Sequence, residues 1–333
     1  MSLRRSTIPW PGPGRLTLVL LAVVPAALAY PWPTVRDRWV LGVALAVLIV
    51  LLGWWRRLHL TTMLRRRAAM FRHRGARNQW RSGPDVRTTV SLRVVPSAAD
   101  PLPLPLIAGY LDRYGLRADT VRITSRDTGV GTTAAARDTW IGLTFSAAAN
   151  LAALQARSAQ IPLRETAEVA ARRLADHLRE VGWETTTAGP DEVPELFAAT
   201  ARGTWRGLTD ETGDYVAAYQ VAVDDGLPDT LAQIWAHGAR ETWTAVEIGA
   251  DHHTVAAGCA IRTGDRPAGA GPLPGLTPQH GNHRAALQAL HPLSALRLSG
   301  HAELSAAVIA ALRWPVTTGG SQSSPHARHA VVS

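Results

Sequence analysis

Residues 16–55 read LTLVLLAVVPAALAYPWPTVRDRWVLGVALAVLIVLLGWW, and this stretch decides the architectural class of the chain. It consists of two apolar runs, residues 16–32 and 39–55, joined by a short charged turn. A helix needs roughly 17 to 25 residues to cross the hydrocarbon core of a bilayer, and each run reaches the lower limit. The stretch therefore predicts a transmembrane hairpin of two helices.

The arginines around the predicted hairpin indicate its orientation. Three arginines precede the first run and eight lie between residues 56 and 77 with no acid among them, whereas the turn holds only Arg36 and Arg38 beside Asp37. Basic residues close to a span resist translocation across the membrane. We therefore predict a multi-pass protein of the cell membrane, with both termini and the main domain in the cytoplasm.

The residues that flank the two runs predict contact with lipid. Tryptophan rings favour the headgroup level of a bilayer, and arginines are attracted to anionic lipids. The predicted anchoring and lipid-contacting residues are Trp32, Trp39, Trp54, Trp55, Arg56, Arg57, Arg65, Arg66 and Arg67. The eight arginines supply most of the net charge of +9. Nucleic-acid binding is not favoured, because neither interleaved aromatic residues nor a known binding module accompanies them.

The first run has a rival interpretation as a cleaved signal peptide. Ala27-Leu28-Ala29 ends an apolar stretch that arginines precede, which is the pattern of a cleavage site. On that interpretation one span remains, and the arginines after it still hold the rest of the chain in the cytoplasm. Whether the mature protein retains the first span stays open from the sequence.

Composition excludes several chemistries. All 35 basic residues are arginine, so a Walker A lysine, a Schiff-base lysine and a serine–lysine pair are ruled out. Cys259 is the single cysteine, so the chain can form neither an internal disulfide nor a zinc site with several thiolates.

The remainder of the chain alternates helical and strand patterns. Apolar residues from Leu163 to Val181 recur at steps of three and four and predict a helix, which Gly182 ends. Further helices are predicted at 193–201 and near 284–290. Strands are predicted at 88–95, 120–124, 139–145, 183–187, 215–223, 241–248 and 254–262, with a loop at 125–136. The last two strands should pair as an antiparallel hairpin.

These elements predict a mixed α/β (α+β) cytoplasmic domain behind the transmembrane hairpin. The predicted divisions are a cytoplasmic N-terminus at 1–15, the hairpin at 16–55, an arginine-rich juxtamembrane segment at 56–80, the domain at 81–316 and a disordered tail at 317–333.

No motif for catalysis, cofactor binding or metal binding stands out. His280 and His283 supply only two ligands, and His252-His253 falls in a predicted hairpin turn. The carboxylates at 210–214 and 224–225 lie beside glycines, where turns are expected, and Gly129-Val-Gly131 lacks the third glycine of a phosphate-binding loop. We therefore predict no catalytic residue, no cofactor and no metal.

Trp205 and Trp235 are the candidate contacts with a partner protein. Both lie outside clear periodic patterns, and tryptophan serves both as a core residue and as an interface anchor.

With these features in this order, the chain resembles the EccE family, whose members are membrane components of the type VII (ESX) secretion apparatus of actinobacteria. The resemblance rests on the N-terminal hairpin, the arginine-rich junction, the strand RDTWIGL at 137–143 and the helix with ARRLA at 171–175 and HLREVG at 177–182. It continues weakly through Thr204-Trp-Arg206 and 215–219. It covers most of residues 15–265.

The resemblance implies a structural, non-catalytic subunit at the periphery of a membrane complex built with EccB, EccC and EccD, in which another subunit is the ATP-driven motor. No catalytic residues carry over from the family. The sequence looks like a short member of the family, without the long C-terminal extension of some relatives, so contacts made by that extension are not expected to carry over. The alternative from a different class is a membrane-tethered enzyme with a cytoplasmic α/β domain.

Overall fold

The computed structural model describes residues 87–95, 101–129, 136–158 and 162–316, together with the isolated positions 24, 42, 54, 55, 58 and 59. The chain divides into two units, residues 1–73 and 74–333. The two predicted spans, the arginine-rich segment and the tail at 317–333 lie outside the described residues, apart from those isolated positions. None of the helices in the described part has the length and apolarity needed to span a membrane.

In the first unit, two short strands pair with each other. Strand β1 (Trp54–Trp55) is antiparallel to β2 (Leu58–His59), with Trp54 opposite His59. Trp54 and Trp55, which the sequence pattern places at the end of the second predicted span, are therefore in a strand.

The second unit is built on one antiparallel sheet. Its main path runs β7 (Thr185–Ala188), β3 (Arg87–Val94), β6 (Ala136–Ser146), β5 (Leu116–Thr128), β11 (Glu241–Gly249), β12 (Thr254–Thr263), β10 (Tyr215–Val221), β9 (Leu208–Thr209) and β8 (Arg202–Gly203). Three short strands are added at its margins: β13 (Leu276–Pro278) on β10, β14 (Ala302–Glu303) on β12 and β4 (Asp112–Arg113) on β5. This is the mixed, sheet-rich α/β domain that the sequence predicts.

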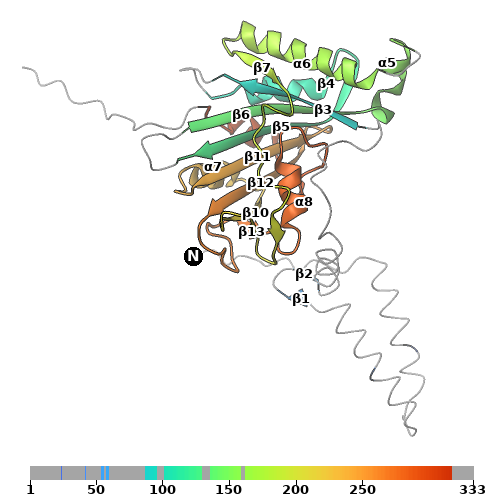
Figure 1. Cartoon of the computed structure of the whole chain (residues 1–333). Coiled ribbons are helices and arrows are strands. Elements are labelled where there is room, and N and C mark those ends of the chain that lie inside the picture. Colours follow the sequence, from blue (N-terminus) through green and yellow to red (C-terminus); the bar gives the residue numbers. More distant parts are fainter. Residues whose placement is uncertain are drawn as a thin grey trace, which may run out of the picture. The chain divides into compact units, whose positions relative to one another are not determined.

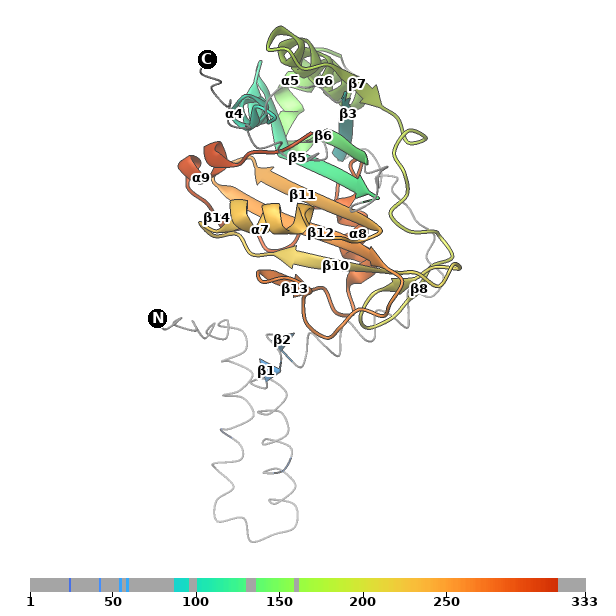
Figure 2. The ribbon, with the colours of Figure 1, turned by 90° about the vertical axis from the view of Figure 1, so that its left-hand side faces the viewer.

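Helices cover both faces of the sheet (Figures 1 and 2). Helices α4 (Leu104–Ala108), α7 (Leu227–Trp235) and α9 (Ala306–Ala311) lie on one face, and α8 (His283–Leu290) lies on the other. The long helix α6 (Leu163–Glu180) packs on β3, β6 and β7. The short helices η1 (Gly109–Leu111), η2 (Ala148–Asn150) and α5 (Leu151–Gln155) complete the helices described in the second unit.

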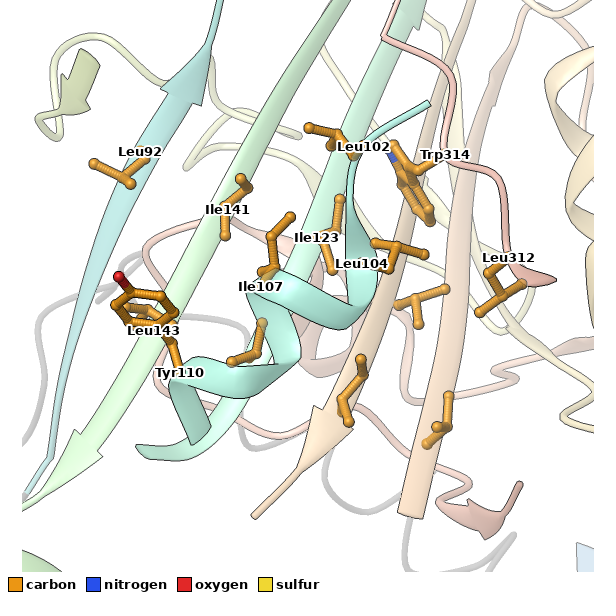
Figure 3. Packing of buried hydrophobic residues seen from close by; sticks show 14 of the residues in the cluster. Leu92, Leu102, Leu104, Ile107, Tyr110, Ile123, Ile141, Leu143, Leu312 and Trp314 are labelled. Atoms are coloured by element: carbon orange, nitrogen blue, oxygen red, sulfur yellow. The ribbon is translucent and has the colours of Figure 1, made fainter. Parts of the chain in front are cut away.

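Each face of the sheet has its own hydrophobic core. Because side chains alternate along a strand, β11 sends Val246 and Ile248 into the core under α4, α6 and α7, and sends Trp243 and Ala245 into the core under α8. Figure 3 shows Leu104 and Ile107 of α4 directed at strand residues such as Ile123. The α8 core contains a stacked pair, Trp140 and Trp243, whose ring centroids lie 5.5 Å apart.

Most predicted elements are confirmed with small changes of boundary. Helix α6 begins at Leu163 as predicted, and Gly182 follows it with φ of 88°, the left-handed conformation of a C-terminal cap. The hairpin of β11 and β12 is confirmed, with Ile248 opposite Val255.

Two local predictions are wrong. Residues 193–201 form turns and bends rather than a helix. In a helix the Leu196 carbonyl oxygen would accept from the amide of residue 200, but here it accepts from a distant arginine. The Leu196 carbonyl accepts from Arg262 and the Ala201 carbonyl from Arg284. The loop predicted at 125–136 begins later, because β5 continues to Thr128 and the Asp127–Arg137 ion pair joins it to β6.

Candidate functional site beneath helix α8

Helix α8 and strands β10 and β12 line a partly open cavity of about 200 Å³. Small residues create the space: Gly258 lies on the strand side, and Ala286 and Ala289 lie on the helix side. Leu290 and Leu298 supply apolar walls. The cavity is thus built from side chains that are too short to fill the layer between the helix and the sheet.

One end of the cavity is polar. The Gln279 side-chain amide donates to the Ser299 hydroxyl at 3.2 Å and to the Gln220 side-chain oxygen at 3.4 Å. Gly300 has φ of 84°, and a Cβ at this position would collide with the side-chain amide of Gln220. Glycine at position 300 therefore suits both the left-handed backbone and the close approach of this segment to β10.

A buried ion pair ties the same segment to the centre of the sheet. Arg122 on β5 binds the carboxylate of Glu247 on β11, and their side chains are 4% and 0% exposed. The guanidinium also donates to the carbonyl oxygens of His291 and Ser294, at 3.4 and 3.1 Å. One arginine thus joins two strands to the chain that leaves α8.

Glu247 is held as a carboxylate by several basic groups. Burial alone would raise its pKa, but the hydrogen bond from His301, at 3.0 Å, and the charge of Arg122 outweigh burial and lower the pKa. Arg297 adds a third basic contact, at 3.5 Å. An acid held in its ionised form by three basic groups is suited to a structural role and poorly suited to proton donation.

A second charged network holds the loops at the other end of this face. Glu241 accepts from Arg126 at 2.5 Å and from Arg262 at 2.6 Å, and Arg262 also contacts Asp210 at 2.7 Å. Burial raises the pKa of Glu241, but hydrogen bonds from the two arginines outweigh this and lower it. The network fixes the turn at 210–214 and, through Arg262, the carbonyl of Leu196.

The two histidines weighed as metal ligands are buried in backbone contacts. His280 pairs through its ring nitrogens with the carbonyl oxygens of Trp205 and Gly269, at 3.2 and 3.1 Å. His283, at the start of α8, accepts a hydrogen bond from the Ala218 amide through Nδ1. The described residues contain no cluster of three or more His, Cys, Asp or Glu side chains suited to a metal ion.

The remaining candidate groups lie where turns were predicted. His252 and His253 are exposed in the turn of the β11–β12 hairpin, where Asp251 accepts from the His253 and Thr254 amides. Asp210 accepts from the Asp214 amide, and Asp224 from the Gly226 amide. Burial raises the pKa of the Cys259 thiol, which lies in the core of the opposite face.

The two tryptophans predicted to contact a partner protein have different surroundings in the structure. Trp205 is half-buried and stacks on His280, with ring centroids 5.7 Å apart. Trp235 ends α7, packs edge-on against Trp314 at 5.2 Å and lies under the Arg137 guanidinium. Each therefore has contacts within its own chain, and their role in partner binding stays a prediction.

His291 supplies a pH-dependent part of the stability of this region. Burial, with a contribution from the charge of Arg122, lowers its pKa from 6.5 to about 4. Below pH 6.5 the histidine becomes protonated in the unfolded chain, whereas in the folded chain it stays neutral down to about pH 4. The free energy of unfolding therefore falls as the pH is lowered through this window. When the pH is lowered from 7 to 5, we expect this histidine to reduce the free energy of unfolding by about 2 kcal/mol.

The measurement is urea unfolding of the wild type and of His291→Asn at both pH values. The asparagine oxygen can replace Nδ1 as acceptor for the Leu293 amide, so the substitution removes the titration with little change in structure. On acidification from pH 7 to pH 5, the free energy of unfolding of the variant should fall by about 2 kcal/mol less than that of the wild type. Equal losses in the two proteins would show that His291 does not carry the effect.

Comparison with known proteins identifies the family to which this domain belongs. Residues 133–257 match the model of a family described as "Putative type VII ESX secretion system translocon, EccE". ESX-3 secretion system protein EccE3 of Mycobacterium tuberculosis (strain CDC 1551 / Oshkosh) is 56% identical over 323 residues, which is 95% of this chain and 96% of that protein. The protein of the same name from Mycolicibacterium smegmatis (strain ATCC 700084 / mc(2)155) is 49% identical, over 94% of this chain and 98% of its own length. With such identity over nearly the whole chain, the protein belongs to the EccE family.

Proposed function

We propose that this chain is a structural, non-catalytic membrane subunit of a type VII (ESX) protein secretion complex. Membership of the EccE family over nearly the full length is the observation that carries the proposal. The chemistry of the domain is in keeping with it, because the buried ionisable groups described above hold strands and loops together. The names of the relatives favour an ESX-3 type of system.

The proposed partners are the other core membrane subunits, EccB, EccC and EccD, and anionic lipids. The two apolar runs at 16–32 and 39–55 would anchor the protein, with the arginine-rich segment at 56–80 at the cytoplasmic surface. Residues 81–316 would then form a cytoplasmic domain between this anchor and the tail at 317–333. The charge asymmetry around the apolar runs supports this topology.

One experiment tests function and topology together. In a strain that lacks the gene, a chain with the substitution Thr34→Cys should restore secretion, and its new thiol should react with a membrane-impermeant maleimide added to intact cells. The background should be low, because Cys259 is fully buried and is the single native cysteine. The wild-type chain, which restores secretion without labelling, is the control.

Two results would contradict the proposal. Failure of the wild-type gene to change secretion in the deletion strain would remove the assigned function. Restored secretion by the Thr34→Cys chain, with a new thiol that reacts only after the cells are opened, would leave the function and refute the topology.

A further inference from the structure

The turn between β4 and β5 carries an aromatic residue in a strained conformation. Strand residue Arg113 pairs with Leu116, so Tyr114 and Gly115 are the two central residues of a hairpin turn. Their φ angles are 57° and 70°. Positive φ at both positions is the type I′ geometry, which strongly favours Asn-Gly and disfavours a bulky side chain at the first position. Tyrosine at 114 therefore occupies a backbone conformation that disfavours its side chain.

The ring of Tyr114 is exposed and framed by cations. The residue is 55% exposed, which is unusual for a large aromatic side chain in this domain. The guanidinium carbons of Arg113 and Arg173 lie 5.3 and 4.6 Å from its ring centroid. Tyr110 lies edge-on to it, with centroids 6.4 Å apart. The result is an aromatic surface with an arginine from β4 and an arginine from α6.

In the described part of the chain, carboxylates pair with neighbouring arginines but with neither of these two. Within the described residues neither Arg113 nor Arg173 forms an ion pair, whereas neighbouring Arg117 pairs with Asp112 at 3.4 Å and Arg179 pairs with Asp176 at 2.7 Å. Two guanidinium groups beside an exposed ring are therefore left to bind an external anion. Forked guanidinium groups match the geometry of carboxylates.

The platform beneath Tyr114 is fixed in position. Tyr110 is 3% exposed, and its hydroxyl donates to the Arg173 carbonyl oxygen at 2.9 Å, which links η1, the short helix just before β4, to α6. Burial and the neighbouring Tyr114 raise the pKa of Tyr110 to about 12, so this hydroxyl keeps its proton. The two arginines are thus presented from elements that cannot move apart freely.

We propose that Arg113, Tyr114 and Arg173, here called the Tyr114 patch, form a docking site for an Asp- or Glu-rich segment of a partner protein. The inference rests on the proposed function, because the partner would be another subunit of the secretion complex. Tyrosine and arginine are the residue types that most often dominate binding energy at protein interfaces. Strain kept at an exposed position is a recognised mark of a functional site.

An anionic membrane is the less favoured occupant. Exposed acids neighbour the patch on the same elements, Asp112 on β4 and Asp176 and Glu180 on α6, and they would disfavour contact with a flat anionic surface. A single protein segment can place its carboxylates on the two arginines and leave the acids in solvent. The mixed charge therefore favours a protein partner.

The test uses the full-length chain in cells, with the photo-crosslinker benzoylphenylalanine in place of Tyr114. Irradiation should link residue 114 to a subunit of the complex, and the linked peptide should map to an acidic segment. The double substitution Arg113→Gln/Arg173→Gln should reduce the cross-link by about tenfold or more. Arg157→Gln/Arg266→Gln removes two exposed arginines elsewhere and should leave the cross-link unchanged.

A second pair of variants separates binding from folding. Tyr114→Asn suits the turn better, so its melting temperature should be unchanged or higher by about 2 to 4 °C, yet the variant should be depleted from the complex. Tyr114→Phe keeps both ring and strain and should behave as the wild type. A lower melting temperature for Tyr114→Asn with normal recovery in the complex would show that the tyrosine is structural and would overturn the inference.

The remaining outcomes are also decisive. Normal assembly of Arg113→Gln/Arg173→Gln, or a wild-type complex without any cross-link from residue 114, would overturn the docking site and leave the subunit role intact. Cross-links confined to lipid, with binding to phosphatidylglycerol vesicles that the same double substitution abolishes, would assign the patch to the membrane instead. Absence of the wild-type chain from every membrane assembly would refute the proposed function itself.

Discussion

Replacing Arg122 with alanine should destabilise the folded domain by about 3 to 5 kcal/mol, because it leaves a buried carboxylate without its main partner. Glu247 is 0% exposed, and the two remaining basic contacts reach only its other oxygen, Oε1. The carbonyl oxygens of His291 and Ser294 lose their donor as well. Urea unfolding followed by tryptophan fluorescence measures the change.

The matched control is Arg164→Ala. Arg164 pairs with Glu168 on the surface of α6, where the two side chains are 76% and 41% exposed, and its loss should cost less than about 0.5 kcal/mol. The double substitution Arg122→Met/Glu247→Leu should recover much of the lost stability, because it removes both buried charges. If the Arg122→Ala protein were as stable as the Arg164→Ala protein, the Arg122–Glu247 ion pair would not hold the sheet together.

Leu174→Asp should remove the protein from cells. Leu174 is 0% exposed in the core between α6 and the sheet, so the substitution buries an unpaired charge there. The cost of several kcal/mol is comparable with the whole stability of a domain, about 5 to 15 kcal/mol. Steady-state level by immunoblot and helix content by circular dichroism are the measurements.

Arg172→Asp is the control on the exposed face of the same helix. It introduces the same residue two positions away and should leave the protein level within about twofold of the wild type, since surface substitutions change stability by only about 0.5 kcal/mol. A Leu174→Asp chain present at normal levels with normal helix content would contradict the packing described for α6.

Elements with strong local patterns were predictable from the sequence. Helix α6 carries a continuous apolar stripe, and β11 and β12 flank a turn rich in Asp and His, so local periodicity alone predicts them. Helix α7 was missed, because Pro228 and the adjoining Asp-Asp-Gly sequence resemble a turn. Proline is nevertheless tolerated in the first turn of a helix. The segment 193–201 was misassigned, since its carbonyl partners Arg262 and Arg284 are remote in sequence.

The candidate sites depend on contacts that local patterns do not encode. Arg122 and Glu247 lie 125 residues apart, and nothing in either strand marks them as partners. The hairpin turn at Tyr114-Gly115 was not predicted from the sequence. The one local signal for a hairpin was that glycine, which tolerates the positive φ of a type I′ turn.

The most direct test of the central claim, that this protein is a subunit of a membrane secretion complex, is the composition of the assembly recovered with it. The tagged full-length chain would be purified from mildly solubilised membranes and analysed by native mass and protein identification. We predict a large assembly that contains EccB, EccC and EccD with the tagged chain in a fixed ratio. Recovery of the chain as a monomer or with none of these subunits, from cells that secrete normally, would contradict the account.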